Sequence, residues 1–279
     1  MRVLTFNVLT MRSADGPRRH EVAKRLLAAL RADVMALQEV SRSPVFDQAA
    51  ELAGDGWTVL DLPGGDINHE GESLASRLPI VRADELDVPV VDDTEGGWRA
   101  TALAAELAVP TPVGSVLIVH HRGTYELHRE DVRERQAVAT ARWIEQLIAG
   151  RPELPVVLLG DLNAGPDSAS LRFLTGRQSL DGLSVRYEDA WEAVNPGQPG
   201  HTFTPLNPLV RAGEMPLERG RRIDHVLVRS GAHGPPLGVV DCRLVCDMPV
   251  EGVWASDHFG VLAELSPPSH APGTWRSTT

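Results

Sequence analysis

The sequence contains few cysteines and no long apolar segment. Its two cysteines, Cys242 and Cys246, have no His or Cys cluster beside them, so neither a disulfide framework nor a zinc site is expected. No apolar run approaches the length needed to cross a bilayer, and the N-terminus lacks the apolar block and cleavage site of a signal peptide. We therefore expect a protein of the reducing cytoplasm, without a membrane span.

Basic residues are outnumbered as well. The 279 residues include 27 Lys and Arg against 38 Asp and Glu, which gives a net charge of −11. Non-specific affinity for long polyanions depends on a basic surface, so the composition argues against it. The apolar fraction of 42% is sufficient for a substantial core, and the length fits one large domain or two small ones.

Apolar periodicity predicts a chain of alternating strands and helices. The helical pattern falls at residues 18–31, 130–149 and 168–174. Strand patterns fall at residues 3–8, 32–40, 57–60, 73–76, 100–108, 113–120, 154–161, 223–228, 239–246 and 261–265. No repeat or long polar linker divides the chain, so we predict one domain over residues 1–266 and a disordered tail over 267–279. Many strands with helices between them favour an α/β fold in which helices cover packed sheets.

One strand ends in the unusual polar sequence GDLN, with Asp161 and Asn163 one residue apart. Alternate residues of a strand share a face, so the two side chains are expected to lie side by side. Asp, Asn, Gly and Pro are also turn residues, and a simple turn explains this segment equally well when it is taken alone.

Other strands end or are interrupted in the same way. The polar residues concerned are Asn7, Gln38, Glu39, His120, His121, Asp224, His225, Asp257 and His258. Each has a bland explanation, but burying so many unpaired charges would cost several kcal/mol each. Grouped charges of this kind usually bind a metal or carry out chemistry. Carboxylates and amides without thiolates favour Mg²⁺ or Mn²⁺.

These segments also carry a family resemblance. The motifs LTFNV, LQEV, ESLASRLPI, HH, GDLN, RIDHVLV and SDHFGV occur in the order seen in the endonuclease/exonuclease/phosphatase family. The chain resembles that family from residue 3 to about residue 265. The resemblance implies a four-layer α/β sandwich, with two packed mixed β-sheets flanked by helices, and metal-dependent cleavage of phosphoester bonds.

The resemblance implies a role for each matching residue. Glu39 is expected to be the main metal ligand, assisted by Asn7 and by the carboxylate of Asp257. Asp161 is expected to orient and deprotonate the attacking water, with Asn163 holding that aspartate or the phosphate. His258 is expected to contact the scissile phosphate, and Asp224 to orient this histidine.

Three positions depart from the family pattern. The central strand ends in VHHR, where we place His121 on the family histidine position with His120 as its substitute. His225 stands where an aromatic residue is common and receives no role. Glu72 stands where the family often has Asn or a small residue, which affects substrate contacts rather than the metal centre.

We therefore expect a Mg²⁺-dependent phosphodiesterase or nuclease. The alternatives are a phosphatase or phospholipase-type hydrolase of a small metabolite or lipid headgroup, and a non-catalytic binding domain on the same fold. Arg221 and Arg222 precede the IDH motif and are predicted to bind the substrate phosphate, whereas the acidic segment 61–72 would repel a nucleic-acid backbone. The expected partner is a phosphoester, either nucleic acid or small molecule, and no motif indicates a protein partner.

Overall fold

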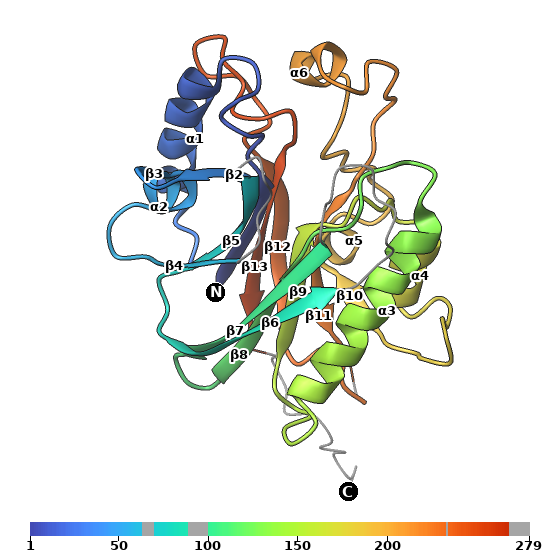
Figure 1. Ribbon diagram of the computed structural model, residues 1–279. Helices are drawn as coiled ribbons and strands as arrows, with labels where there is room; N and C mark the ends of the chain where they lie inside the picture. Colours follow the sequence, from blue (N-terminus) through green and yellow to red (C-terminus); the bar gives the residue numbers. More distant parts are fainter. Residues whose placement is uncertain (63–69, 89–99, 233, 268–279) are drawn as a thin grey trace, which may run out of the picture.

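Two β-sheets pack face to face in this computed structural model, which describes residues 1–62, 70–88, 100–232 and 234–267 (Figure 1). The first sheet runs in the order β12 (Gly238–Val245), β13 (Gly260–Ser266), β1 (Arg2–Asn7), β2 (Val34–Ser43), β5 (Glu70–Ser76) and β4 (Thr58–Asp61), with β3 (Phe46–Asp47) paired to β2. The second runs in the order β10 (Tyr187–Asp189), β11 (Asp224–Arg229), β9 (Val156–Asp161), β8 (Gly114–His121), β7 (Ala100–Val109) and β6 (Ile80–Val88). Both sheets are mixed, because the β1–β2 and β8–β9 pairs are parallel while pairs such as β1–β13 and β9–β11 are antiparallel.

Helices cover the outer faces of both sheets (Figure 1). Helices α1 (Gly16–Leu30) and α2 (Gln48–Ala53) lie on the first sheet, and α3 (Glu130–Leu147) and α4 (Ala169–Leu174) lie on the second. The short helix α5 (Ala190–Val194) packs on β11 and β12, and α6 (Pro208–Ala212) stands at one end of the molecule. This arrangement confirms the predicted four-layer sandwich.

Three apolar layers hold the four structural layers together. Val3, Ile118 and Val157 belong to the layer between the sheets, Leu117 to the layer under α3 and α4, and Leu4 to the layer under α1. Each buried side chain of this size contributes about 1.5–3 kcal/mol. Both sheets are covered on both faces, which explains why the central strands read as continuous apolar runs.

Strand alternation carries the polar residues into the space between the sheets. In β1, Asn7 shares a face with Val3, which packs between the sheets. In β9, Asp161 likewise follows Val157 and Leu159, and in β11 Asp224 shares the face of Val226. Polar ends of both sheets therefore meet in one buried space.

Sequence periodicity does not predict the short helices and strands. Helices α2, α5 and α6 and strand β10 are too short to show a period, and β6 is an edge strand with several exposed side chains. The segment Pro205–Gly220 contains α6, whose Val210 packs with Phe203 and Ile223.

Parts of two predictions lie outside the described residues. Of the acidic segment 61–72, only its two ends are described, and they belong to β4 and β5. Of the predicted tail only Pro267 is described. No helix in the described ranges is long and apolar enough to cross a membrane.

One buried ion pair tests how far electrostatics stabilises this fold. Asp189 accepts a hydrogen bond from Arg222 at 2.5 Å, both side chains are less than 10% exposed, and the carboxylate also caps α5. Burial disfavours the carboxylate, but His225 and Arg222 outweigh this effect and hold the pKa of Asp189 below its usual range.

We expect Asp189→Asn to lower the free energy of unfolding by about 3–5 kcal/mol, because the buried guanidinium of Arg222 loses its nearest counter-charge and keeps only the more distant, exposed Glu192. Asn still caps the helix. Urea unfolding measures this. The matched control is Asp181→Asn, which breaks an exposed pair with Arg142 and should cost less than about 1 kcal/mol. Equal losses in the two variants would contradict the prediction.

Candidate active site

Seven of the predicted polar residues meet at one end of the inter-sheet space. They come from β1, β2, β9 and β11 and from the loops that follow β9 and precede β13. We call this group the polar cluster, and its members are Asn7, Glu39, Asp161, Asn163, Asp224, Asp257 and His258.

Asn7 links the two sheets within this cluster. Its Nδ2 donates to Oε1 of Glu39 at 3.0 Å and to Oδ2 of Asp161 at 3.1 Å. Its Oδ1 accepts the backbone N–H of Leu9 at 3.0 Å, which assigns the orientation of the amide. Both Asn7 and Asp161 are about 1% exposed. One amide therefore holds two carboxylates from opposite sheets.

A β-bulge directs Glu39 into the cluster. Regular alternation after Gln38, which lies between the sheets, would turn Glu39 toward the outer face. The register of β2 against β5 shifts between Leu37 and Val40, and Glu39 has a φ of 58°. A left-handed backbone conformation costs a residue other than glycine on the order of 1–3 kcal/mol and is typical of functional positions.

The end of β9 depends on a close backbone approach. Gly160 has a φ of 153°, and a Cβ at this position would lie 1.8 Å from the carbonyl oxygen of His121. Only glycine therefore lets β9 approach β8 closely enough to place Asp161.

Asn163 does not lie beside Asp161 in the manner predicted. The strand ends at Asp161, and Asn163 has a left-handed φ of 51°. Its backbone N–H donates to Oδ1 of Asp161 at 3.1 Å, while its side-chain amide donates to the carbonyl of Gly123 at 3.0 Å. Asn163 thus holds the aspartate through its backbone, as in an Asx turn.

Asp224 and His258 form the tightest pair of the cluster. His258 Nδ1 lies 2.9 Å from Oδ2 of Asp224. The hydroxyl of Thr202 accepts the backbone N–H groups of Ile223 and Asp224, and the ring of Phe203 packs on His258 at 4.8 Å. These contacts hold Asp224 and the imidazole in position. Sequence reasoning overlooked Thr202 and Phe203, because the segment that contains them has no charged motif.

Asp257 completes the cluster on the side of Glu39. Its Oδ1 accepts a hydrogen bond from Ser256 Oγ at 3.2 Å. The side chain of Asn207, which caps α6, donates to the carbonyls of Ser256 and Asp257. The arm that carries α6 therefore helps to position this loop.

Arg122 is the main residue that the sequence analysis overlooked. Its Nη2 donates to Oε1 of Glu39 at 2.5 Å, and its Nη1 donates to Oε1 of Glu72 at 3.2 Å. The side chain is 11% exposed. Arg122 shares the parity of Ile118, which lies between the sheets. A strict face assignment for β8 would have identified it.

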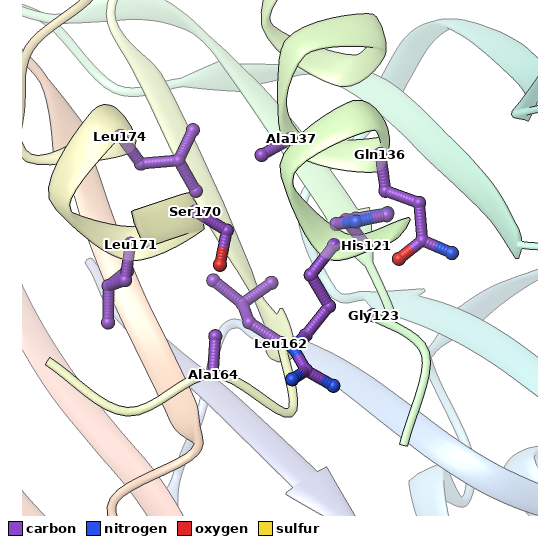
Figure 2. Close-up of a pocket in the computed structure, with 10 residues that line it drawn as sticks. His121, Gly123, Gln136, Ala137, Leu162, Ala164, Ser170, Leu171 and Leu174 are labelled. Carbon is purple, nitrogen blue, oxygen red and sulfur yellow. The ribbon is translucent and has the colours of Figure 1, made fainter. Parts of the chain in front are cut away.

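The same alternation of side chains along β8 places His121 outside the cluster, which corrects the sequence-based prediction. His121 shares the face of Leu117, in the layer under α3 and α4. Its imidazole lines a small cavity with Gln136, Leu162 and Ser170 (Figure 2). His120 does face the other sheet, but its Nε2 lies 2.7 Å from Nε2 of Gln38, and burial lowers its pKa to about 3.

The two arginines that were predicted to bind phosphate lie in different surroundings. Arg221 lies near the cluster, with its guanidinium 5.8 Å from the ring of Phe203 and paired to Glu218 at 2.7 Å. Arg222 is buried against Asp189, and its predicted substrate contact is wrong, since the guanidinium is enclosed and already paired.

Burial and neighbouring charges shift the pKa values of the cluster. Burial and the carboxylate of Asp224 raise the pKa of Asp161 to about 6. Burial disfavours the imidazolium of His258, but the carboxylates of Asp224 and Asp161 outweigh it and raise this pKa to about 10. Burial raises the pKa of Asp257. For Glu39, Arg122 and Asn7 outweigh burial and lower the pKa.

The donor set fits a hard divalent cation. In the described part of the chain, ligand atoms of Asp161, Asp224 and His258 lie within 4.8 Å of one another, a spacing that would suit a metal ion if the imidazole were neutral. Oδ1 of Asp224 is buried without a hydrogen-bond partner there. Carboxylates outnumber cations in and around the cluster, so a divalent cation would relieve their repulsion.

The comparisons with known proteins identify the family of this chain. The sequence pattern of the Endonuclease/Exonuclease/phosphatase family matches residues 4–258, and the chain belongs to this family. No curated protein matches the sequence.

Solved structures confirm the fold. TDP2 from Danio rerio, solved with a single-strand DNA product, has a TM-score of 0.73 at 18% identity, over 95% of this chain and 98% of that one. The catalytic domain of human Nocturnin, solved with a bound sulfate anion, has a TM-score of 0.71 at 16% identity, over 96% and 94%. An endonuclease/exonuclease/phosphatase from Bacteroides vulgatus has a TM-score of 0.71 at 19% identity, over 96% and 98%.

The Asp224–His258 pair provides a direct test of the cluster's electrostatics. In metal-free protein, Asp224→Asn removes a carboxylate that raises the pKa of His258, while the burial that lowers it remains. We expect this pKa to fall by about two units, measured by an NMR titration of the imidazole nitrogens. The exposed Asp167→Asn should leave it unchanged. An unaltered pKa in Asp224→Asn would contradict the electrostatic account.

Proposed function

We propose that the protein hydrolyses phosphoester bonds with the help of Mg²⁺ or Mn²⁺, and that phosphodiesters are its preferred substrates. The observation that carries this proposal is the buried polar cluster itself. It combines hard oxygen donors, a carboxylate with a pKa near 6 and an ion-paired imidazole in one place. Membership of the endonuclease/exonuclease/phosphatase family supports the same reaction class.

In this proposal Glu39 and Asp257 hold the cation, and Asn7 orients the Glu39 carboxylate by donating to its Oε1. Carboxylate oxygens are ligands that Mg²⁺ prefers, and the bulge turns the Glu39 carboxylate toward this position. A cation bound there would neutralise phosphate charge and stabilise the leaving oxygen.

Asp161 acts as the general base. A pKa of about 6 means that Asp161 is ionised above that pH, so at neutral pH it can accept a proton from the attacking water. Asn7 and the backbone N–H of Asn163 each donate to one of its oxygens and thereby fix its direction.

His258 donates to the phosphate. Its Nδ1 is engaged by Asp224, which orients the ring and keeps it protonated well above neutral pH. Its other nitrogen can then stabilise the charge that develops on a phosphate oxygen. Phe203 on the ring face restricts its rotation.

The substrate is proposed to be a phosphodiester that contacts the protein through one or two phosphates. The DNA product in the Danio rerio TDP2 structure supports a nucleic-acid diester, whereas the net charge of −11 opposes tight binding of long polyanions. Hydrolysis of monoesters or lipid headgroups alone would favour the phosphatase or phospholipase alternative, and absence of any turnover the binding-domain alternative.

The roles of Asp161 and Glu39 can be tested together. We expect Asp161→Asn to lower kcat by about 10²–10⁴-fold, because it removes the base and keeps the shape. Glu39→Gln should abolish Mg²⁺-dependent turnover and weaken Mn²⁺ binding measured by calorimetry. The matched control is Asp167→Asn, an exposed aspartate in the loop after Asn163, which should behave as wild type. Full activity in Glu39→Gln would disprove the metal assignment.

Salt dependence tests the size of the substrate contact. Between ionic strengths of about 0.01 and 0.15 M, at constant Mg²⁺, initial rates on a short single-stranded oligonucleotide should give a slope of log kcat/KM against log salt of about −0.7 to −1.4. This range corresponds to one or two neutralised phosphates. A slope of about −4 or steeper, with a preference for long DNA, would instead indicate a basic groove.

A further inference from the structure

The position of Arg122 raises a question that the proposed function leaves open. Its guanidinium lies between the carboxylates of Glu39 and Glu72, at 2.5 and 3.2 Å. Glu39 is the proposed metal ligand, so the Arg122 guanidinium already occupies one of the oxygens that a divalent cation would use. The inference below rests on the proposed function and concerns what Arg122 does.

The register of the second sheet places Arg122 next to the general base. His120 of β8 pairs with Leu159 of β9, so a continuation by two residues brings Arg122 level with Asp161. The backbone N–H of Gly123 donates to the carbonyl of Asp161, which confirms that the two strands stay adjacent there. An arginine guanidinium is always protonated in proteins, so Arg122 carries its charge beside the reacting groups.

A buried guanidinium needs acceptors for its donors. Taking one carboxylate partner away from a buried arginine removes part of its charge compensation, which is unfavourable unless another acceptor replaces it. If Glu39 turns to a divalent cation, Nη2 of Arg122 loses that partner, whereas Nη1 keeps Glu72. A phosphate group is a well-matched replacement, because its oxygens accept bidentate hydrogen bonds from an arginine fork.

We propose that Arg122 is a phosphate-binding residue that exchanges Glu39 for a non-bridging oxygen of the substrate when Glu39 binds the divalent cation. Glu72 holds the guanidinium in place during the exchange. Without cation and substrate, the Arg122–Glu39 pair keeps both charges compensated. Glu72, which departs from the usual family pattern, and Arg122 thus belong to one arrangement.

If this exchange occurs, Arg122 affects the binding of the cation and the binding of the phosphate in opposite directions. Arg122 competes with the cation for Glu39, so its removal should tighten cation binding. Arg122 also binds the phosphate, so its removal should weaken phosphate binding to the cation-loaded protein. A purely structural ion pair predicts neither this opposition nor an effect on phosphate.

The test measures binding of Mn²⁺ and of inorganic phosphate to the full chain by calorimetry, without turnover. In Arg122→Gln we expect Mn²⁺ to bind several-fold more tightly, and phosphate to bind the Mn²⁺-loaded protein about 10- to 100-fold more weakly, as for the loss of a hydrogen bond to a charged group. The matched control is Arg42→Gln on β2, which removes the same charge. Arg42 contacts Asp61 and the carbonyl of Glu72, but not the Glu39 carboxylate. Both affinities should stay within about twofold of wild type in this control.

A second variant keeps the test decisive if Arg122→Gln unfolds. Arg122→Lys preserves the charge without the fork, so it should fold, retain wild-type Mn²⁺ affinity within a few-fold and still bind phosphate at least about tenfold more weakly. Phosphate affinity equal to wild type in the folded Arg122 variants, or weaker Mn²⁺ binding in Arg122→Gln, would overturn the exchange. Failure of the wild-type protein to bind Mn²⁺ would instead overturn the proposed function.

Discussion

The contact between the inner faces of the two sheets determines where the functional side chains lie. Apolar residues of β1, β9 and β11 bind the sheets together, and the same faces of these strands carry Asn7, Asp161 and Asp224. The force that packs the sheets therefore also collects the polar cluster. Asn7 then connects the sheets directly, through hydrogen bonds to Glu39 and Asp161.

Much of this arrangement is predictable from the sequence, since buried charge at the ends of apolar strands is costly unless it is used. That argument, with the order of the motifs, identifies Asn7, Glu39, Asp161, Asp224 and His258 and the layered fold. It does not predict the bulge that turns Glu39 inward. It also cannot tell which face of β8 looks toward the other sheet, so His121 was chosen where Arg122 belongs. Arg222 was misjudged because its partner Asp189 lies 33 residues away in the sequence, and local sequence patterns do not show such pairs.

The cluster concentrates negative charge that the protein compensates only in part. Arg122 and the imidazolium of His258 oppose the carboxylates of Glu39, Glu72, Asp161, Asp224 and Asp257. Burial and the repulsion from Asp224 together raise the pKa of Asp161. The carboxylates repel one another in the buried space between the sheets. A divalent cation that binds there together with a phosphate would reduce this repulsion.

The central claim is that a divalent cation binds to Glu39 inside the polar cluster. The most direct measurement is an anomalous difference map from crystals grown with Mn²⁺. The account predicts a peak in contact with the Glu39 carboxylate, between the two sheets. A map with no peak in the cluster, or with Mn²⁺ only at other carboxylates of the surface, would contradict it.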